Sequence, residues 1–155
     1  MNQDLFKRIL VATDGSENAK RAARVAVDLA KECGSELVVV NVIPPLTSIQ
    51  VGVTPPVPVT VTEQYYKDAR ARAEDLVEEV ISEAKKRGVR VRGVLLDKPY
   101  SVVEGITSYA KDEGADLIVL GTRGLGGFKK LLIGSVSSGG VSHARCHDQR
   151  HQAVL

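Results

Sequence analysis

Four short apolar runs, separated by longer segments with helical periodicity, constrain the fold of this chain most strongly. The runs lie at 7–13, 36–42, 89–96 and 116–120. The first, K-R-I-L-V-A-T, has a continuous apolar centre, which is typical of parallel strands covered on both faces. Because crossovers between parallel strands are nearly always right-handed, strands that alternate with helices predict one doubly wound α/β domain.

The segments between the runs carry helix signals. Residues 17–33 follow Ser16, a residue type that caps helices, and end before Gly34. Residues 62–87 and 99–113 show the same three-to-four-residue apolar spacing. Inward-facing positions are expected at Ala19, Ala22, Ala23, Ala26, Leu29, Ala30, Cys33, Ala69, Ala73, Leu76, Val77, Val80, Ile81, Ala84, Val102, Val103, Ile106, Tyr109 and Ala110.

One long stretch, 44–61, is rich in proline, threonine and valine. Its prolines cannot donate to a central ladder or sit inside a helix. We interpret it as a loop near the carboxyl edge of the sheet, either a lid or a partner-facing segment. A disordered excursion is an equally good interpretation of a stretch of this length.

A glycine-rich stretch, 121–135, follows the fourth apolar run and precedes a segment, 136–145, that can be helical. Its glycines allow positive φ and close backbone approach to a ligand. The start of a helix adds unpaired N–H groups and partial positive charge. Such a loop between a strand and a helix predicts a phosphate-binding site.

Topology places this stretch beside the end of the first strand. In a flavodoxin-like (Rossmann-like) sheet of order 3-2-1-4, ligands sit at the carboxyl ends of the strands, where the strand order reverses. Asp14, directly after the first apolar run, and Gly121, directly after the fourth, are then expected to border one crevice.

Composition excludes several function classes. A chain of 155 residues with 43% hydrophobic residues fits one globular domain, and its net charge of +2 is spread without a basic face for nucleic acid. The start of the chain has no signal-peptide pattern, and no apolar run approaches the roughly 20 residues of a membrane span. Two cysteines, Cys33 and Cys146, do not suggest a disulfide framework. We therefore expect a soluble cytoplasmic protein.

The spacing G-x2-G-x9-G-S at 121–135 resembles the nucleotide-binding signature of the universal stress protein family, and the resemblance covers residues 6–146. The segments I-L-V-A-T-D-G-S at 9–16, D-L-I-V-L-G-T-R-G at 116–124 and G-S-V-S-S at 134–138 match its flanks. The resemblance implies an ATP-binding regulatory protein that takes ATP or another adenine nucleotide, with Mg²⁺ or Mn²⁺.

The resemblance also implies site residues by position. Asp14 would hold the ribose or the base edge, and Arg123 could reach the phosphates. The base pocket would be lined by Ala12, Thr13 and Val42, and ribose and phosphates would contact Leu120, Gly121, Gly124, Gly134, Ser135 and Val136.

The C-terminus departs from the family pattern. Family members end in a hydrophobic strand that pairs across a homodimer, whereas Cys146 is followed here by H-D-Q-R-H-Q-A-V-L. We expect a domain over 1–146, an atypical polar tail over 147–155 without a fifth strand, and a homodimer that does not use this tail as the family does. Spacing in H-x3-H-x3-H from His143, with Cys146, would suit a transition metal; a polar tail is the favoured interpretation, so no metal site is predicted.

Enzyme signatures are missing from the sequence. It has no G-x4-G-K-[ST], G-x-S-x-G or H-E-x-x-H pattern, and Asp14 is the only acid expected in the crevice. An efficient ATPase needs a positioned base and a metal ligand. The favoured hypothesis is an ATP-binding stress-response regulator without efficient catalysis. The alternatives are a weak ATP hydrolase using the same crevice and an interaction module that binds no nucleotide.

Overall fold

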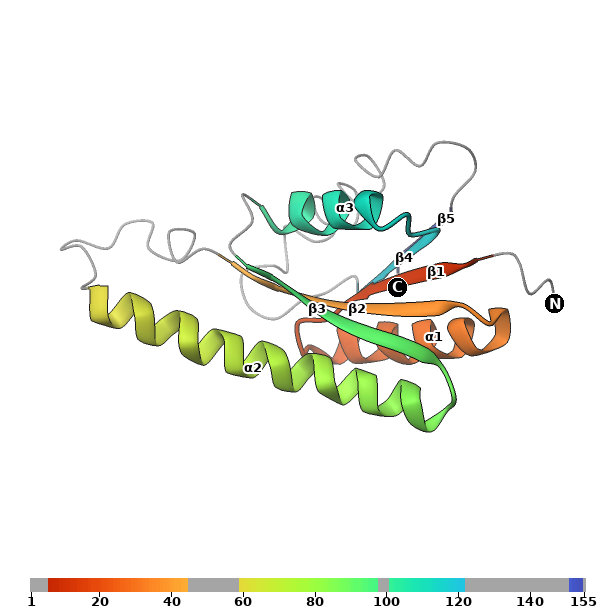
Figure 1. The fold of residues 1–155 in the computed structure, drawn as a ribbon, viewed down its shortest axis with the longest axis horizontal. Helices are drawn as coiled ribbons and strands as arrows, with labels where there is room; N and C mark the ends of the chain where they lie inside the picture. The colour runs from red at the N-terminus through yellow and green to blue at the C-terminus, as the bar shows by residue number, and fades with distance from the viewer. Residues whose placement is uncertain (1–5, 45–58, 98–100, 122–150, 155) are drawn as a thin grey trace.

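The computed structural model describes residues 6–44, 59–97, 101–121 and 151–154 of the chain, the last as backbone alone. Helices and strands alternate along it, as Figure 1 shows. In order they are β1 (Arg8–Ala12), α1 (Glu17–Cys33), β2 (Glu36–Ile43), α2 (Val59–Lys86), β3 (Arg90–Asp97), α3 (Val102–Asp112), β4 (Leu117–Leu120) and β5 (His151–Val154).

The strands form one parallel sheet of order β3-β2-β1-β4-β5. The predicted order 3-2-1-4 is confirmed. The expectation that the C-terminal tail forms no strand was wrong, because β5 pairs with β4 from Leu117↔His151 to Leu120↔Val154. Its ladder uses backbone groups, which otherwise would leave the edge of the buried strand β4 open. The domain boundary at residue 146 stays a prediction.

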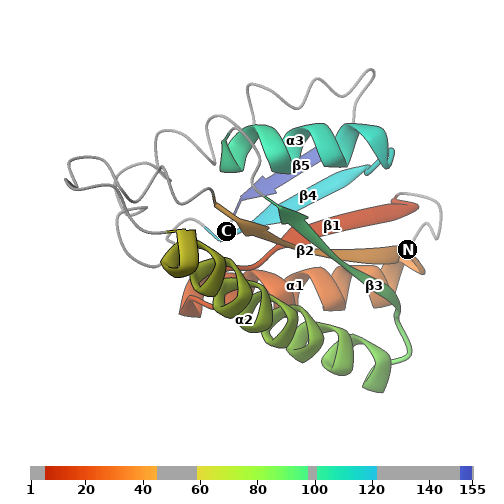
Figure 2. The same ribbon diagram turned by 60° about the vertical axis from the view of Figure 1, so that its left-hand side comes forward.

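In the part of the chain that the structure describes, helices cover both faces of the sheet. In Figures 1 and 2, α1 and α2 lie on one face and α3 on the other. Alternate residues of each central strand therefore enter different cores: Ile9 and Val11 pack with α1 and α2, whereas Leu10 packs with α3. All three are fully buried, so β1 is the centre of the fold.

Helix α1 begins and ends where its sequence predicts. The side chain of Ser16 accepts a hydrogen bond from the backbone N–H of Ala19 at 3.1 Å, and Gly34 closes the helix at φ 66°. Its small residues are buried against the sheet as expected, and Val27, which the sequence analysis did not single out, is buried with them. Small side chains let the helix axis lie close to the strands.

Two helix starts differ from expectation. Helix α2 begins at Val59 instead of residue 62, directly after the last proline of the 44–61 stretch, because nothing beyond that proline interrupts a helix. The loop predicted at 44–61 was therefore wrong over 59–61, which belong to α2, and its residues 45–58 lie outside the described residues. Helix α3 begins at Val102 instead of Pro99, because the side chain of Ser101 accepts from Glu104 N at 3.0 Å and caps the helix there.

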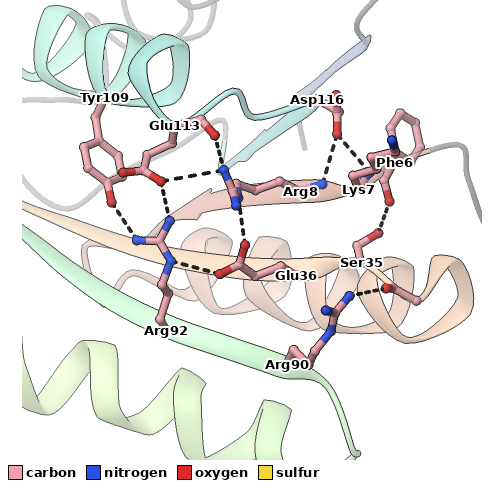
Figure 3. Close-up of polar contacts among 11 residues, drawn as sticks. Phe6, Lys7, Arg8, Ser35, Glu36, Arg90, Arg92, Tyr109, Glu113 and Asp116 are labelled. Carbon is pink, nitrogen blue, oxygen red and sulfur yellow. Dashed lines mark hydrogen bonds and ion pairs between the residues drawn. The ribbon is translucent and has the colours of Figure 1, made fainter.

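A network of charged side chains ties α3 to the amino ends of the strands (Figure 3). Glu36 on β2 accepts from Arg8 Nε on β1 at 2.7 Å and from Arg92 Nε on β3 at 3.0 Å. Arg92 also donates to the Tyr109 hydroxyl at 3.0 Å and pairs with Glu113, both carried by or next to α3. The Arg8 hydrogen bond, with that of Arg92, lowers the pKa of the Glu36 carboxyl, although its partial burial acts in the opposite direction.

A second set of contacts fixes the same end of the sheet. The Asp116 carboxylate, just before β4, accepts from the backbone N–H groups of Lys7 at 2.9 Å and Arg8 at 3.0 Å. The Ser35 hydroxyl, before β2, donates to the carbonyl of Phe6 at 2.6 Å. The starts of β1, β2 and β4 are thereby held in register by side chains as well as by the ladder (Figure 3).

Removal of the Glu36 charge should weaken the fold in a pH-dependent way. Because the folded-state pKa lies below the ordinary value of 4.5, this carboxylate stabilises the fold above that pH, and its contribution disappears as pH falls through the folded-state pKa. We expect Glu36→Gln to lower the free energy of unfolding at pH 7 by about 1 kcal/mol, with a smaller difference from wild type in acid. Urea titrations of both proteins at pH 7 and in acid measure this difference in the free energy of unfolding.

The matched control is Glu74→Gln, which removes an exposed partner of Arg70 one helical turn away at 3.5 Å. The side chains of Arg70 and Glu74 are both largely exposed to solvent, so we expect little change in stability. Equal stability of Glu36→Gln and wild type at pH 7 would contradict the role given to the network.

Candidate functional site

The candidate site lies at the carboxyl edge of the sheet, opposite the charged network. Strand β1 runs between β2 and β4, with Ala12 paired to Val40 and Val11 to Val119. The chain therefore leaves β1 and β4 side by side. The chain builds the sheet outward from β1, first to β2 and β3 on one side and then to β4 on the other. Open α/β sheets bind ligands at the point where the strand order reverses in this way.

The turn after β1 is held by its own polar groups. The backbone N–H of Thr13 still donates to the carbonyl of Val40 at 2.9 Å, so Thr13 extends the hydrogen bonding beyond the strand. Asp14 Oδ1 accepts from the N–H of Ser16 at 2.9 Å, a local aspartate turn. Gly15 has φ 81°, a conformation that suits glycine. Asp14 is consequently presented at the surface from a defined backbone.

One functional candidate was missed by the sequence analysis. The side chain of Asn41, 7% exposed near the end of β2, donates from Nδ2 to the carbonyl of Thr13 at 2.7 Å. It is the single buried side-chain amide of the part of the chain that the structure describes. The available signal was a polar residue, Asn41, that interrupts the apolar part of the run E-L-V-V-V-N-V.

Gly121 lies close to the backbone of the first turn of α1. A Cβ at this position would lie 2.9 Å from the backbone N of Ala19 and 2.9 Å from the carbonyl carbon of Asn18. Backbone atoms of a capped helix cannot move aside as a flexible side chain can. Glycine therefore lets the start of the 121–135 stretch rest on the first turn of α1, whose N-terminal N–H groups favour anions.

The structure places six of the predicted site residues at this edge, with different accessibility. The side chains of Thr13 and Leu120 are only 6% and 5% exposed, so they offer backbone atoms more readily than side chains to a ligand. Ala12, Val42 and Gly121 are half-buried, and Asp14 is exposed. The other predicted residues, Arg123, Gly124, Gly134, Ser135 and Val136, lie outside the described residues.

The apolar members share one face. Ala12, Val42 and Leu120 all pack against the core beneath α3. On the opposite face, α1 and α2 border a hollow of about 450 Å³ that reaches Thr13 and Gly15. Of the predicted base-pocket residues, Thr13 lines that hollow, whereas Ala12 and Val42 do not.

The chain is similar to known proteins over nearly its whole length. The model of the "Universal stress protein family" matches residues 5–147. This chain belongs to the universal stress protein family. A universal stress protein of Thermus aquaticus, named for the 3′ region of a QAH/OAS sulfhydrylase, is 39% identical over 145 residues, covering 92% of this chain and 96% of that one.

Solved structures of the family share its fold. A universal stress protein family member from Burkholderia pseudomallei is 26% identical, with a TM-score of 0.75 over 97% of this chain and 96% of that one. More distant universal stress proteins, 18–20% identical with TM-scores of 0.62–0.66, were solved with cAMP, with dAMP (Archaeoglobus fulgidus) and with AMP (Arabidopsis thaliana). These cover 96–97% of this chain and 90–98% of their own.

In the described ranges of the chain, no helix has the length and apolar character to cross a membrane. The same ranges hold no group of three or more His, Cys, Asp or Glu side chains arranged for a metal ion. His143, Cys146 and His147 of the weighed histidine cluster lie outside the described residues, and His151 is described only as backbone.

Substitution of Gly121 should disturb the first turn of α1. We expect Gly121→Ala to lower the free energy of unfolding by about 1–3 kcal/mol, because the methyl group must push two backbones apart. The amide signals of Asn18 and Ala19 in a ¹⁵N–¹H NMR spectrum should shift with it. Chemical denaturation and that spectrum are the measurements.

Gly34→Ala is the control for a general glycine effect. Its φ of 66° strains an alanine, but no atom lies within 4 Å of the added Cβ. It should cost about 1 kcal/mol and leave Asn18 and Ala19 unshifted. Unchanged stability and signals in Gly121→Ala would show that the close approach is absent in solution.

Proposed function

We propose that this protein binds an adenine nucleotide, in the first place ATP, at the carboxyl ends of β1, β2 and β4, and acts as a stress-response regulator. The observation that carries the proposal is the contact of Gly121 with the first turn of α1, beside the Asp14 turn. It brings the first residue of the glycine-rich stretch, a helix N-terminus and a carboxylate to one edge of the sheet, where we propose the nucleotide binds. Relatives of the same fold with bound cAMP, dAMP and AMP support it.

Each group has a proposed role. Asp14 accepts hydrogen bonds from ribose hydroxyls, because an exposed carboxylate offers only acceptors. Ala12 and Val42 give apolar surface to the base. Gly121, Gly124, Gly134, Ser135 and Val136, with Arg123, take the phosphates, and Thr13 and Leu120 contribute backbone.

The predicted site residues offer a divalent cation only one carboxylate ligand, Asp14. Mg²⁺ bound to nucleotides is held mainly by phosphate oxygens and water, with one or two carboxylates. Asp14 is the only carboxylate among the predicted site residues, so Mg²⁺ or Mn²⁺ would arrive on the phosphates and neutralise their charge.

We propose binding without efficient turnover. Asp14 is the one predicted site residue able to act as a base, and its Oδ1 is already engaged by the N–H of Ser16. Phosphoryl transfer to water needs both a positioned base and charge stabilisation. The proposal also includes the cytoplasmic location and the homodimer that the family resemblance implies.

Calorimetric titration with ATP and Mg²⁺ tests the site. We expect micromolar binding by wild type and loss of most of it in Gly124→Val, because a branched side chain would stand where phosphates approach the backbone. Gly34→Ala, which alters a glycine remote from the crevice, should bind as wild type does. Absence of binding by wild type would overturn the proposal, and rapid phosphate release would replace it with the hydrolase alternative.

The role of Asp14 is tested by changing protein and ligand together. Asp14→Asn keeps an acceptor for the N–H of Ser16 but removes the charge. We expect wild type to prefer ATP over 2′-deoxy-ATP or 3′-deoxy-ATP by about tenfold, the value of one hydrogen bond to a charged group. That preference should nearly vanish in Asp14→Asn. An equal preference in both proteins would show that a residue other than Asp14 contacts the ribose hydroxyls.

A further inference from the structure

The buried amide of Asn41 ties the turn after β1 to the neighbouring strand. Its Nδ2 lies 2.7 Å from the carbonyl oxygen of Thr13, across 28 positions of sequence. The side chain is 7% exposed, so water does not readily replace this partner. Loss of the hydrogen bond would leave a buried donor and a buried acceptor unsatisfied.

Both backbone polar groups of Thr13 are therefore bound to β2. The N–H of Thr13 donates to the carbonyl of Val40, and its carbonyl accepts from the Asn41 side chain. A peptide plane fixed at its carbonyl cannot rotate freely, so the direction of the next residue is set. The next residue is Asp14.

The fixed peptide also sets the rest of the turn. Asp14 Oδ1 accepts from the N–H of Ser16, Gly15 adopts φ 81°, and Ser16 caps α1 through Ala19. Each contact depends on the direction in which the chain leaves Thr13. Asn41 acts on this turn from a strand that is not adjacent to it in sequence.

We propose that Asn41 is a positioning residue that, through the carbonyl of Thr13, orients the Asp14 carboxylate for ribose recognition. It rests on the proposed nucleotide-binding function, and it assigns Asn41 no contact with the nucleotide. A buried residue with a purely structural role would change stability alone. A positioning residue also changes the discrimination between ribose and deoxyribose.

The variant Asn41→Asp replaces the side-chain amide by a carboxyl group of nearly the same shape. At neutral pH an introduced carboxylate only accepts, so it repels the carbonyl of Thr13. Burial raises the pKa of such a carboxyl, and its protonated form can donate again. The hydrogen bond to Thr13 should consequently be broken where the introduced carboxyl is ionised and restored where it is protonated, and the comparison of pH 8 with pH 5.5 favours the first state and then the second.

Titrations with ATP and with 2′- or 3′-deoxy-ATP at the two pH values measure the affinity and the ribose preference of each protein. At pH 8 we expect Asn41→Asp to bind ATP about tenfold more weakly than wild type and to have lost the ribose preference. At pH 5.5 both should return toward the wild-type values measured at that pH. Asn41→Leu, which has similar size and no donor, should lose the preference at both pH values.

Wild-type protein supplies a test that requires no variant. The Asn41 side-chain N–H protons should exchange with solvent far more slowly than those of Gln64, whose Nε2 donates to Asp68 in an exposed pair. This measurement decides the hydrogen bond even where Asn41→Asp or Asn41→Leu fails to fold. Exchange as fast as that of Gln64 would overturn the inference.

The outcomes separate the two proposals. A wild type that binds no nucleotide would overturn the proposed function and with it the ribose role, while slow Asn41 exchange would still establish the tie to Thr13. A wild type that binds ATP with a ribose preference, together with Asn41→Leu that keeps this preference, would overturn the positioning role alone.

Discussion

The buried position of β1 is the constraint on which the rest of the structure depends. Its residues Ile9, Leu10 and Val11 are fully buried, and it is paired to β2 on one edge and β4 on the other. A strand so enclosed can leave the sheet only at its ends. The carboxyl end must therefore turn sharply at Asp14 and Gly15, and the same turn becomes one wall of the candidate crevice.

Most of the fold could be predicted because local signals and topology agreed. Ser16 and Gly34 marked the bounds of α1, and the apolar runs marked β1 to β4, which lie in the order of the expected flavodoxin-like sheet. Where two signals competed, prediction was wrong: Ser101 caps α3 although Pro99 also suits a helix start. Strand β5 escaped prediction because pairing beside an existing edge needs backbone groups more than an apolar pattern.

The candidate site could be predicted by position but not by orientation. Residue types and strand ends led to Asp14 and Gly121, and both lie at the expected edge. Sequence could not show that Thr13 and Leu120 are buried, since the exposure of a strand-end residue depends on where the chain bends. Nor could it pair Asn41 with Thr13, because that contact arises from the β1–β2 register.

Stabilising contacts and functional groups occupy opposite ends of the same strands. At the amino ends, Glu36 joins Arg8 and Arg92 in a network that holds β1, β2 and β3 to α3 (Figure 3). At the carboxyl ends, conformationally demanding residues such as Gly15, with positive φ, and Gly121, against a helix backbone, contribute little packing of their own. Because parallel strands transmit register along their length, contacts at one end help to keep those loops in place at the other. Variation in the crevice can therefore be tolerated as long as the network and the buried centre of β1 persist.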